Sequence, residues 1–506
     1  MHTARKGFAW FLGAPVVAMA LLAVCGPCLA AADEATIAPA DMPVIGTIDE
    51  RFQSFNIEMV SVTGGPFWKP YAPREESTPH KNKDLFAVRS PIDLGSPRLR
   101  KYAAALSPAY LRVSGTWANT TFFAGSGATP TRPPAGYKSV LTRRQWDSVI
   151  DFSKAVDAPI ITSFATGPGT RDSKGIWKPD QARQIVAATR KAGGRIAAAE
   201  FMNEPDLPAI GGAPAGYGAA AFAHDFQVFH AFIKQAAPNI RILGPGTMGH
   251  SPDDSALFLA SVFGIDAVSY HFYGALSERC AGGHTADVAL SDEWLARTET
   301  TFAFYAALRD RAAVGKPIWL TETAEAACGG NRWSATFLDS FRYLDQLGRL
   351  ARSGVQVVMH NTLVASDYGL LDEMTLAPRP NYWAALLWRQ LMGTVVLDPG
   401  LPVQRGLHVY GHCQRGISGA VALLIINNDP QTSHELVLPN SSMRFTLDAA
   451  TLQDVAVRLN GAALAVEESD QLPKLAGVPA NAGSMRFAPA TITFLTIPDA
   501  GNRNCR

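Results

Sequence analysis

Residues 196–205 read Ile-Ala-Ala-Ala-Glu-Phe-Met-Asn-Glu-Pro, a largely apolar run that ends in an acid followed by proline. A short apolar run without alternation is typical of a strand that is buried on both faces of a parallel sheet. Residues 219–237 follow with the apolar spacing of a helix, so the pair predicts a strand–helix unit. Pro205 prevents further strand pairing and turns the chain away directly after Glu204.

The same unit recurs along most of the chain. We predict eight strands, at residues 52–59, 109–114, 159–164, 196–202, 240–244, 267–272, 317–321 and 355–360. The helices predicted between them include residues 179–192, 219–237, 294–313 and 335–353. Eight strands that alternate with helices favour a (β/α)8 TIM barrel in an α/β protein. An open, doubly wound sheet is the alternative, because periodicity alone does not separate the two.

After a helix-like stretch at residues 382–392 the pattern changes. Short strand-like runs follow, with turn residues and no long helical period between them, at residues 421–426, 434–438, 443–447, 455–459 and 490–497. This pattern is typical of an antiparallel β-sandwich. We therefore predict a catalytic barrel over residues 51–393, a C-terminal sandwich over 394–506, and a segment at 31–50 that can add a strand to the sandwich.

The composition limits the class of protein. A chain of 506 residues is long enough for a catalytic barrel and a second domain, and its 45 basic and 44 acidic residues argue against a general nucleic-acid binder. Arg5 and Lys6 precede an uncharged run at residues 8–29, so residues 1–30 are predicted to be a signal peptide. A membrane anchor is the rival, because the run is long enough to span a bilayer. The signal peptide implies an exported protein, periplasmic or secreted, without a membrane span in the mature chain.

Four cysteines remain after such cleavage, and an even number in an exported chain predicts two disulfides. Three pairings are possible. Cys413 and Cys505 lie near the two ends of the sandwich, so we expect them to pair, which leaves Cys280 with Cys328 on the loops after strands six and seven. Zinc is the rival use of cysteine, but the chain has no CxxC or HExxH spacing. We expect no metal and no organic cofactor.

Reacting groups of a TIM barrel gather where its strands end. Glu204 and Glu322 follow the fourth and seventh predicted strands, where an acid is costly unless it is hydrogen-bonded or functional. Taken alone, either acid could be a helix cap or a structural hydrogen-bond partner. Two carboxylates across a cleft are what glycosidic cleavage requires, one as proton donor and one as nucleophile or base. Asn203 could hydrogen-bond the sugar 2-hydroxyl. Other candidates at strand ends or in the following loops are Glu58, Thr116, His271 and Tyr273, and Gly329 and Gly330, whose N–H groups could bind an anion such as a uronate carboxylate.

Two distinctive stretches are residues 94–100 and Leu106-Ser-Pro-Ala-Tyr-Leu-Arg-Val-Ser-Gly-Thr116. Further segments are Asn203-Glu204-Pro205, residues 268–273, 319–323 and 355–359, and Asn381-Tyr382-Trp383. Together they resemble the heparanases of glycoside hydrolase family 79, and the stretch at residues 106–112 is the most specific. The resemblance implies retaining hydrolysis of β-glucuronosyl linkages, with Glu204 as acid/base and Glu322 as nucleophile. It also implies a glucuronate subsite lined by Glu58, Asn203, Tyr273 and Tyr368, and a carboxylate-binding loop at Cys328-Gly329-Gly330.

The leading hypothesis is a single-chain, monomeric, retaining glycosidase of heparanase type that acts on glucuronate-containing saccharides such as heparan sulfate or heparin. The first alternative is an exo-β-glucuronidase for short or unsulfated glucuronides. Cleavage after residue 30 would leave a net charge of −1, which favours this alternative because a sulfated polymer rewards a basic cleft. The second alternative is an inactive carbohydrate-binding protein, against which the presence of both Glu204 and Glu322 argues.

Overall fold

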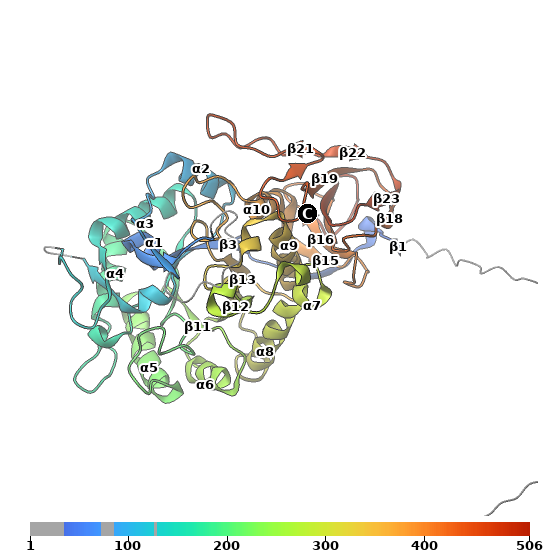
Figure 1. Cartoon of the computed structure of the whole chain (residues 1–506). Helices are drawn as coiled ribbons and strands as arrows, with labels where there is room; N and C mark the ends of the chain where they lie inside the picture. Colours follow the sequence, from blue (N-terminus) through green and yellow to red (C-terminus); the bar gives the residue numbers. More distant parts are fainter. Residues whose placement is uncertain (1–34, 72–84, 126–128) are drawn as a thin grey trace, which may run out of the picture. The chain divides into compact units, whose positions relative to one another are not determined.

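The computed structural model describes residues 35–71, 85–125 and 129–506. Its centre is a closed barrel of eight parallel strands (Figure 1). In chain order these are β3 (Gln53–Glu58), β6 (Leu111–Ser114), β9 (Ile160–Thr162), β10 (Ile196–Glu200), β11 (Arg241–Thr247), β12 (Ala267–Leu276), β13 (Ile318–Ala327) and β14 (Val357–His360). Because β14 pairs with β3, the ring is complete. The predicted TIM barrel is confirmed, and the open sheet is excluded.

Two of these strands extend well beyond their predicted ends. β12 continues to Leu276 and β13 to Ala327, and their pairing shifts register between Tyr270 and His271. The predicted ends are therefore wrong for both strands: Glu322 and His271 lie inside strands, next to a register shift, instead of at strand ends. The extension of β13 is hidden in the sequence, because polar residues alternate with alanine after Thr321. They break the apolar run by which a buried strand is detected.

Helices lie between the barrel strands, as predicted. They are α2 (Pro97–Ala105), α3 (Arg143–Ala155), α4 (Asp180–Lys191), α5 (Ala219–Ala236), α6 (Pro252–Ser261), α8 (Arg297–Ala312), α9 (Phe337–Arg352) and α10 (Pro380–Leu391), with the short α1 (Met59–Thr63) and α7 (Asp292–Leu295). Local signals fix some of their ends. Thr142 and Gln145, for example, form a capping box at the start of α3. The long helix expected at 294–313 is two helices, since α7 ends at Leu295 and α8 begins at Arg297.

The C-terminal region is a β-sandwich of two sheets. The larger sheet contains β2 (Val44–Thr47), β15 (Met392–Leu397), β16 (His408–Gln414), β17 (Val421–Asn427), β24 (Thr491–Ile497), β19 (Ser442–Asp448), β20 (Arg458–Leu459), β21 (Ala462–Ala463) and β22 (Val478–Ala480). The smaller sheet contains β1 (Ala35–Thr36), β18 (His434–Leu438) and β23 (Gly483–Phe487). The run predicted at 455–459 is strand only at its last two residues. The N-terminal strands β1 and β2 pair with β18 and β15.

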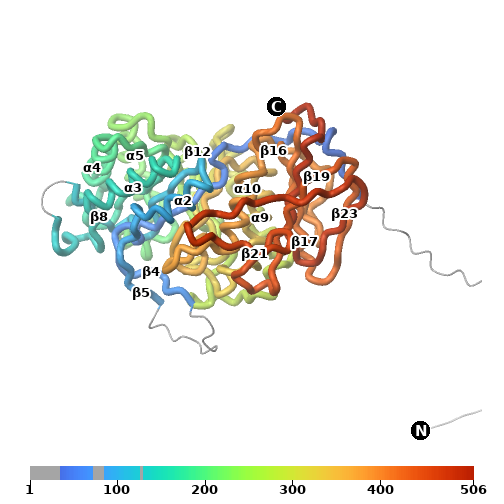
Figure 2. The backbone as a smooth tube through the Cα atoms, turned by 90° about the horizontal axis from the view of Figure 1, so that it is seen from above, coloured from blue at the N-terminus to red at the C-terminus, as the bar shows by residue number. Residues whose placement is uncertain are grey.

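Helices α9 and α10 lie between the barrel and the sandwich in both views (Figures 1 and 2). A buried ionic cluster joins α9 to β16. Asp345 on α9 accepts from His408 Nδ1 at 2.6 Å, from the Tyr410 hydroxyl at 2.6 Å and from Arg349 Nε at 2.6 Å. His408 Nε2 lies 3.1 Å from Asp292. Burial alone would lower the pKa of His408, but the two aspartates, Asp345 above all, outweigh burial and raise it.

This cluster predicts a stability that falls in alkaline solution. A histidine whose pKa is raised by folding stabilises the fold fully below its unfolded pKa of about 6.5, and this contribution is lost as the pH rises through the folded value. The loss is at most about 1.4 kcal/mol per pH unit in that window. Thermal unfolding followed between pH 6 and 9 should show it, and His408→Gln should have a lower Tm at pH 6 and a flatter dependence above it. An equally steep fall in the variant would show that another group is responsible.

Among the residues that the structure describes, Cys413 pairs with Cys505 and Cys280 with Cys328, which are the two disulfides expected from the sequence. The first joins β16 to the C-terminal end of the chain. The predicted signal peptide, residues 1–30, lies outside the described residues. Within the part of the chain that the structure describes, none of the helices combines the length and apolar character needed to cross a membrane.

Candidate active site

Glu204 and Glu322 lie close together in one cleft of about 640 Å³. An oxygen of Glu204, an oxygen of Glu322 and a ring nitrogen of His271 all lie within 4.8 Å of one another. Both carboxylates are buried, with 8% and 5% of the residue exposed. In the described residues this is the one group of three acidic, histidine or cysteine side chains close enough to share a metal ion. The guanidinium of Arg112, 2.6 Å from Glu322, disfavours a second cation there.

Arg112 on β6 organises this centre from inside the barrel. Its Nη1 donates to Glu322 at 2.6 Å, and its Nη2 donates to Glu200 at 2.9 Å and to Asn203 at 2.8 Å. Arg112 and Glu200 are both buried, so each charge depends on the other for compensation. The planar guanidinium thereby fixes the positions of Glu322 and of the segment that carries Glu204.

His271 and Tyr273 on β12 hold one carboxylate each. His271 Nδ1 donates to Glu204 Oε1 at 3.0 Å, and His271 Nε2 lies 3.2 Å from Arg112 Nη2. The Tyr273 hydroxyl donates to Glu322 Oε1 at 2.6 Å. Residues two apart on a strand point to the same face, so one strand supplies both contacts.

The surroundings shift the pKa values of the two acids in opposite directions. Burial raises the pKa of Glu204, and the charge of Glu322 adds to this rise, although the hydrogen bond from His271 opposes it. Burial acts in the same way on Glu322, but His271 and Arg112 outweigh it and lower the pKa. One acid therefore tends to hold its proton while its neighbour remains ionised, which is the division of roles that acid–nucleophile pairs need.

Glu58 provides a third carboxyl group at the end of β3. Burial and the charge of Glu322 raise its pKa well above the ordinary value. Its Oε1 accepts from Asn361 Nδ2 at 3.0 Å, while its buried Oε2 has no hydrogen-bond partner. A Cβ atom at Gly115 would lie 1.7 Å from Oε2, so only glycine leaves room for Glu58 there. Glu58 thus offers a buried carboxyl group that favours its neutral form and has spare hydrogen-bonding capacity.

Asn203 is held in place by Asn119. Asn119 accepts from the Asn203 backbone N–H at 2.9 Å and donates to its carbonyl at 2.8 Å. The Asn203 side-chain nitrogen is buried and has no partner. Its amide therefore remains available to donate, next to Glu204, whose backbone has the unusual φ of 47°.

The two glycines of the predicted carboxylate-binding loop, Gly329 and Gly330, are buried. Gly329 and Gly330 have φ values of 86° and 84°, and a Cβ at Gly329 would lie 2.5 Å from Ser366 Oγ. The carboxyl group of Glu325 ties this loop down by accepting from the Asn331 N–H at 2.9 Å. Burial raises the pKa of Glu325 to about 7.

The structure brings most of the predicted site residues into the cleft wall. Those that line the cleft are Glu58, Thr116, Glu204, Tyr273, Glu322, Tyr368, Cys280 and Cys328. Asn203, His271, Gly329 and Gly330 are buried beside these residues and are not part of its lining. Tyr368 has its hydroxyl 3.5 Å from Asn361 Nδ2, which also donates to Tyr273 at 2.9 Å.

Sequence-based reasoning misses Arg112, Glu200 and Asn119 as members of the site. A usable signal exists for the first two, because a charged residue in the middle of a predicted buried strand needs a buried partner. Asn119 gives no comparable signal.

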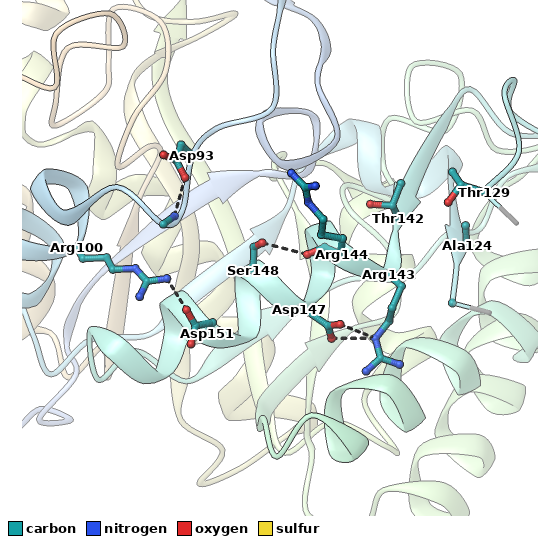
Figure 3. Close-up of a pocket in the computed structure, with 12 residues that line it drawn as sticks. Asp93, Arg100, Ala124, Thr129, Thr142, Arg143, Arg144, Asp147, Ser148 and Asp151 are labelled. Atoms are coloured by element: carbon teal, nitrogen blue, oxygen red, sulfur yellow. Dashed lines mark hydrogen bonds and ion pairs between the residues drawn. The ribbon is translucent and has the colours of Figure 1, made fainter. Parts of the chain in front are cut away.

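A second hollow, of about 780 Å³, lies against α2, α3 and the neighbouring strands β7 (Thr121–Ala124) and β8 (Ser139–Thr142). Four of its charged side chains form two ion pairs: Arg100 with Asp151 at 2.5 Å and Arg143 with Asp147 at 2.8 Å (Figure 3). It shares no lining residue with the cleft that holds the two acids. We assign no role to it.

Comparison with known proteins identifies the family. The sequence model described as "Glycosyl hydrolase family 79, N-terminal domain" matches residues 90–348, just over half of the chain. The chain is 28% identical to mouse heparanase, over 81% of this chain and 88% of that protein. It is 29% identical to heparanase-like protein 1 of Arabidopsis thaliana, over 69% and 67% of the two chains. It is 23% identical to baicalin-beta-D-glucuronidase of Scutellaria baicalensis, over 97% and 96%.

Solved structures support the architecture. A 4-O-alpha-L-rhamnosyl-beta-D-glucuronidase from Fusarium oxysporum aligns with a TM-score of 0.62 at 14% identity, over 92% of this chain and 99% of that chain. An alpha-L-arabinofuranosidase from Thermotoga maritima aligns with a TM-score of 0.63 at 13% identity, over 91% and 99%. At such low identity these matches establish the fold alone. With the family match, they complete the identification: this chain belongs to glycosyl hydrolase family 79 and is a glycoside hydrolase with a TIM barrel and a C-terminal β-sandwich.

Proposed function

We propose that this enzyme is a retaining β-glucuronidase of heparanase type, with Glu204 as acid/base and Glu322 as nucleophile. The observation that carries the proposal is the approach of the two carboxylates to within 4.8 Å. Retaining glycosidases hold their two carboxyl groups about 5–5.5 Å apart, whereas inverting enzymes leave about 6.5–9.5 Å for a water. The raised pKa of Glu204 and the lowered pKa of Glu322 support the assignment of roles.

The reaction has two displacements. In the first, a Glu322 oxygen bonds to the anomeric carbon, the bond to the leaving oxygen breaks, and the Glu204 proton passes to that oxygen. In the second, Glu204, now a carboxylate, takes a proton from water as the water oxygen bonds to the anomeric carbon and the Glu322 ester breaks. Arg112 and Tyr273 stabilise the Glu322 carboxylate before the first step and on its release.

The sugar subsite is assigned to residues around Glu322 on the side of β3 and β14. Glu58, Tyr273 and Tyr368 line it, Thr116 borders it, and the Asn203 amide is available to the sugar 2-hydroxyl. The N–H groups of Gly329 and Gly330 are the candidate donors to the uronate carboxylate. In the described part of the chain, no protein acceptor is bonded to these two N–H groups.

Glucuronate is proposed as the sugar because the names of two relatives contain it. These are the baicalin-beta-D-glucuronidase described above and a hyaluronoglucuronidase of Hirudo nipponia that is 25% identical over 82% of this chain. Heparan sulfate and heparin are the polymer substrates expected from the sequence. The charge of the cleft favours the alternative of short or unsulfated glucuronides. Among the described residues that line it, Lys138 is the one cation, beside three glutamates.

Hydrolysis of 4-nitrophenyl β-D-glucuronide, followed by proton NMR, tests the proposal. The first product should be the β-anomer of glucuronic acid, because two inversions restore the starting configuration. Release of the α-anomer first, or no hydrolysis between pH 4 and 8, would defeat the assignment. Digestion of heparan sulfate in parallel separates the two substrates: internal cuts indicate an endo-acting heparanase, and single glucuronate residues an exo-enzyme. Export and a monomeric state stay predictions.

A further inference from the structure

The wall of the cleft beside Glu204 is apolar. Four side chains form it, and we call them the acid-side shelf: Leu207, Ile210, Met248 and Leu276. Leu207 and Ile210 follow β10, Met248 follows β11, and Leu276 ends β12. These three strands are neighbours in the barrel, so residues far apart in the sequence reach the cleft from one side of the ring.

The shelf lies where a leaving group must lie. The proton donor has to reach the oxygen of the leaving group, and the shelf is attached to the donor's own loop. The Leu207 N–H donates to the Glu204 carbonyl at 3.0 Å, and the Met248 N–H donates to Asp206 at 3.1 Å. The sugar-side residues Glu58 and Asn361 belong to β3 and the end of β14, which stand opposite β11 and β10 in the ring of eight.

Two members of the shelf are unusually exposed for apolar side chains. Ile210 is 66% exposed and Leu276 is 48% exposed. Apolar side chains that remain uncovered inside a ligand cleft gain free energy when a ligand covers them. Both lie in the same cavity as the catalytic carboxylates, so the leaving group is the part of a substrate that can cover them.

Charge argues against an anionic leaving group. Lys138, the one cation among the described lining residues, belongs to the segment before β8, where its N–H bonds to Thr120. The shelf itself carries no charge, and the ionisable group bonded to its backbone, Asp206, is an acid. A sulfated sugar placed on the shelf would lose hydration without gaining a cation as partner.

We propose that the leaving-group subsite selects apolar aglycones larger than one ring, such as biaryl or fused-ring phenols. This rests on the proposed β-glucuronidase function and names its substrate class. The glucuronosyl group passes to Glu322 and then to water as before, and the phenol leaves with the Glu204 proton. The shelf changes only how strongly the aglycone is held.

Two substrates with leaving groups of similar acidity test the inference: phenyl and biphenyl-4-yl β-D-glucuronide. Covering a further ring on the shelf should raise kcat/KM for the biphenyl compound about tenfold or more over the phenyl compound. Ile210→Asn and Leu276→Asn, alone and combined, should bring this ratio toward one. Leu259→Asn is the matched control, because Leu259 on α6 is 55% exposed and does not line the cleft. Its ratio should equal that of the wild type.

The outcomes separate the inference from the function it rests on. A wild-type ratio near one, or a high ratio that survives the double variant, overturns the apolar subsite while the β-glucuronidase stands. Failure to hydrolyse either glucuronide overturns the proposed function, and the inference falls with it.

Discussion

Glu322→Gln is expected to lower kcat/KM for an aryl glucuronide by roughly 10⁴-fold or more, because no glycosyl–enzyme ester can form without the nucleophile. Glu204→Gln should cost less, roughly 10²–10⁴-fold, since it removes acid/base assistance and leaves the nucleophile in place. The loss of kcat/KM in Glu204→Gln should be smaller for leaving groups that depart without protonation, such as 2,4-dinitrophenolate. Steady-state kinetics with a series of aryl glucuronides measures both effects.

Binding and folding must be shown to survive these changes. Both variants should keep the wild-type Tm within a few degrees and still bind a glucuronide, because glutamine preserves the shape of the side chain. Glu293→Gln, an exposed glutamate on α7, is the control and should keep full activity. Wild-type turnover in either active-site variant would contradict the assignment of roles.

Arg112→Met is expected to combine a catalytic loss with a large loss of stability. It leaves the buried carboxylates of Glu200 and Glu322 without their cation, and removing one partner of such a pair costs about 3–5 kcal/mol. The pKa of Glu322 should rise, so the acidic limb of the kcat/KM profile should move to higher pH, and kcat should fall about 10²–10³-fold. Arg112→Lys keeps the charge but not the forked geometry, so its stability and its kcat should lie between those of the wild type and of Arg112→Met. Urea unfolding and pH–rate profiles measure these changes.

Arg349→Met separates stability from catalysis. Arg349 is also buried and pairs with Asp345 at 2.6 Å, but it belongs to the cluster between α9 and the sandwich. Arg349→Met should lower the stability, as Arg112→Met does, while kcat and the pH profile stay at wild-type values. If both arginine variants lost kcat equally, the effect of Arg112 would be one of folding alone.

The barrel can be predicted from the sequence because its strands are short runs buried on both faces. The sandwich is predicted less completely for a physical reason. β15 begins at Met392 directly after α10 ends at Leu391, with no turn residue to mark the change. β16 contains His408 and His412, which are fully buried but look polar in a sequence. Such strands are recognisable only from what covers them.

The candidate site, too, can be predicted from the sequence only in part. Glu204 stands out because the Asn-Glu-Pro motif follows a buried strand, and Glu322 because an acid interrupts an apolar run. Arg112 and Glu200 each interrupt a buried strand, but that they pair with each other cannot be read from the sequence, because the ion pair joins β6 to β10 across β9. Only closure of the barrel brings these two side chains together in its interior. The pKa shifts depend on such contacts and therefore cannot be read from residue types.

The most direct test of the account is to trap the covalent intermediate. A 2-deoxy-2-fluoro-β-D-glucuronosyl fluoride should inactivate the enzyme, because the fluorine slows both displacements and the fluoride leaving group keeps the first fast enough for the ester to accumulate. Mass spectrometry of the digested protein should then place one 2-fluoroglucuronosyl group on Glu322, and Glu322→Gln should remain unlabelled. A label on Glu204 or elsewhere, or turnover without any labelled species, would contradict the claim that these two glutamates act on one anomeric carbon.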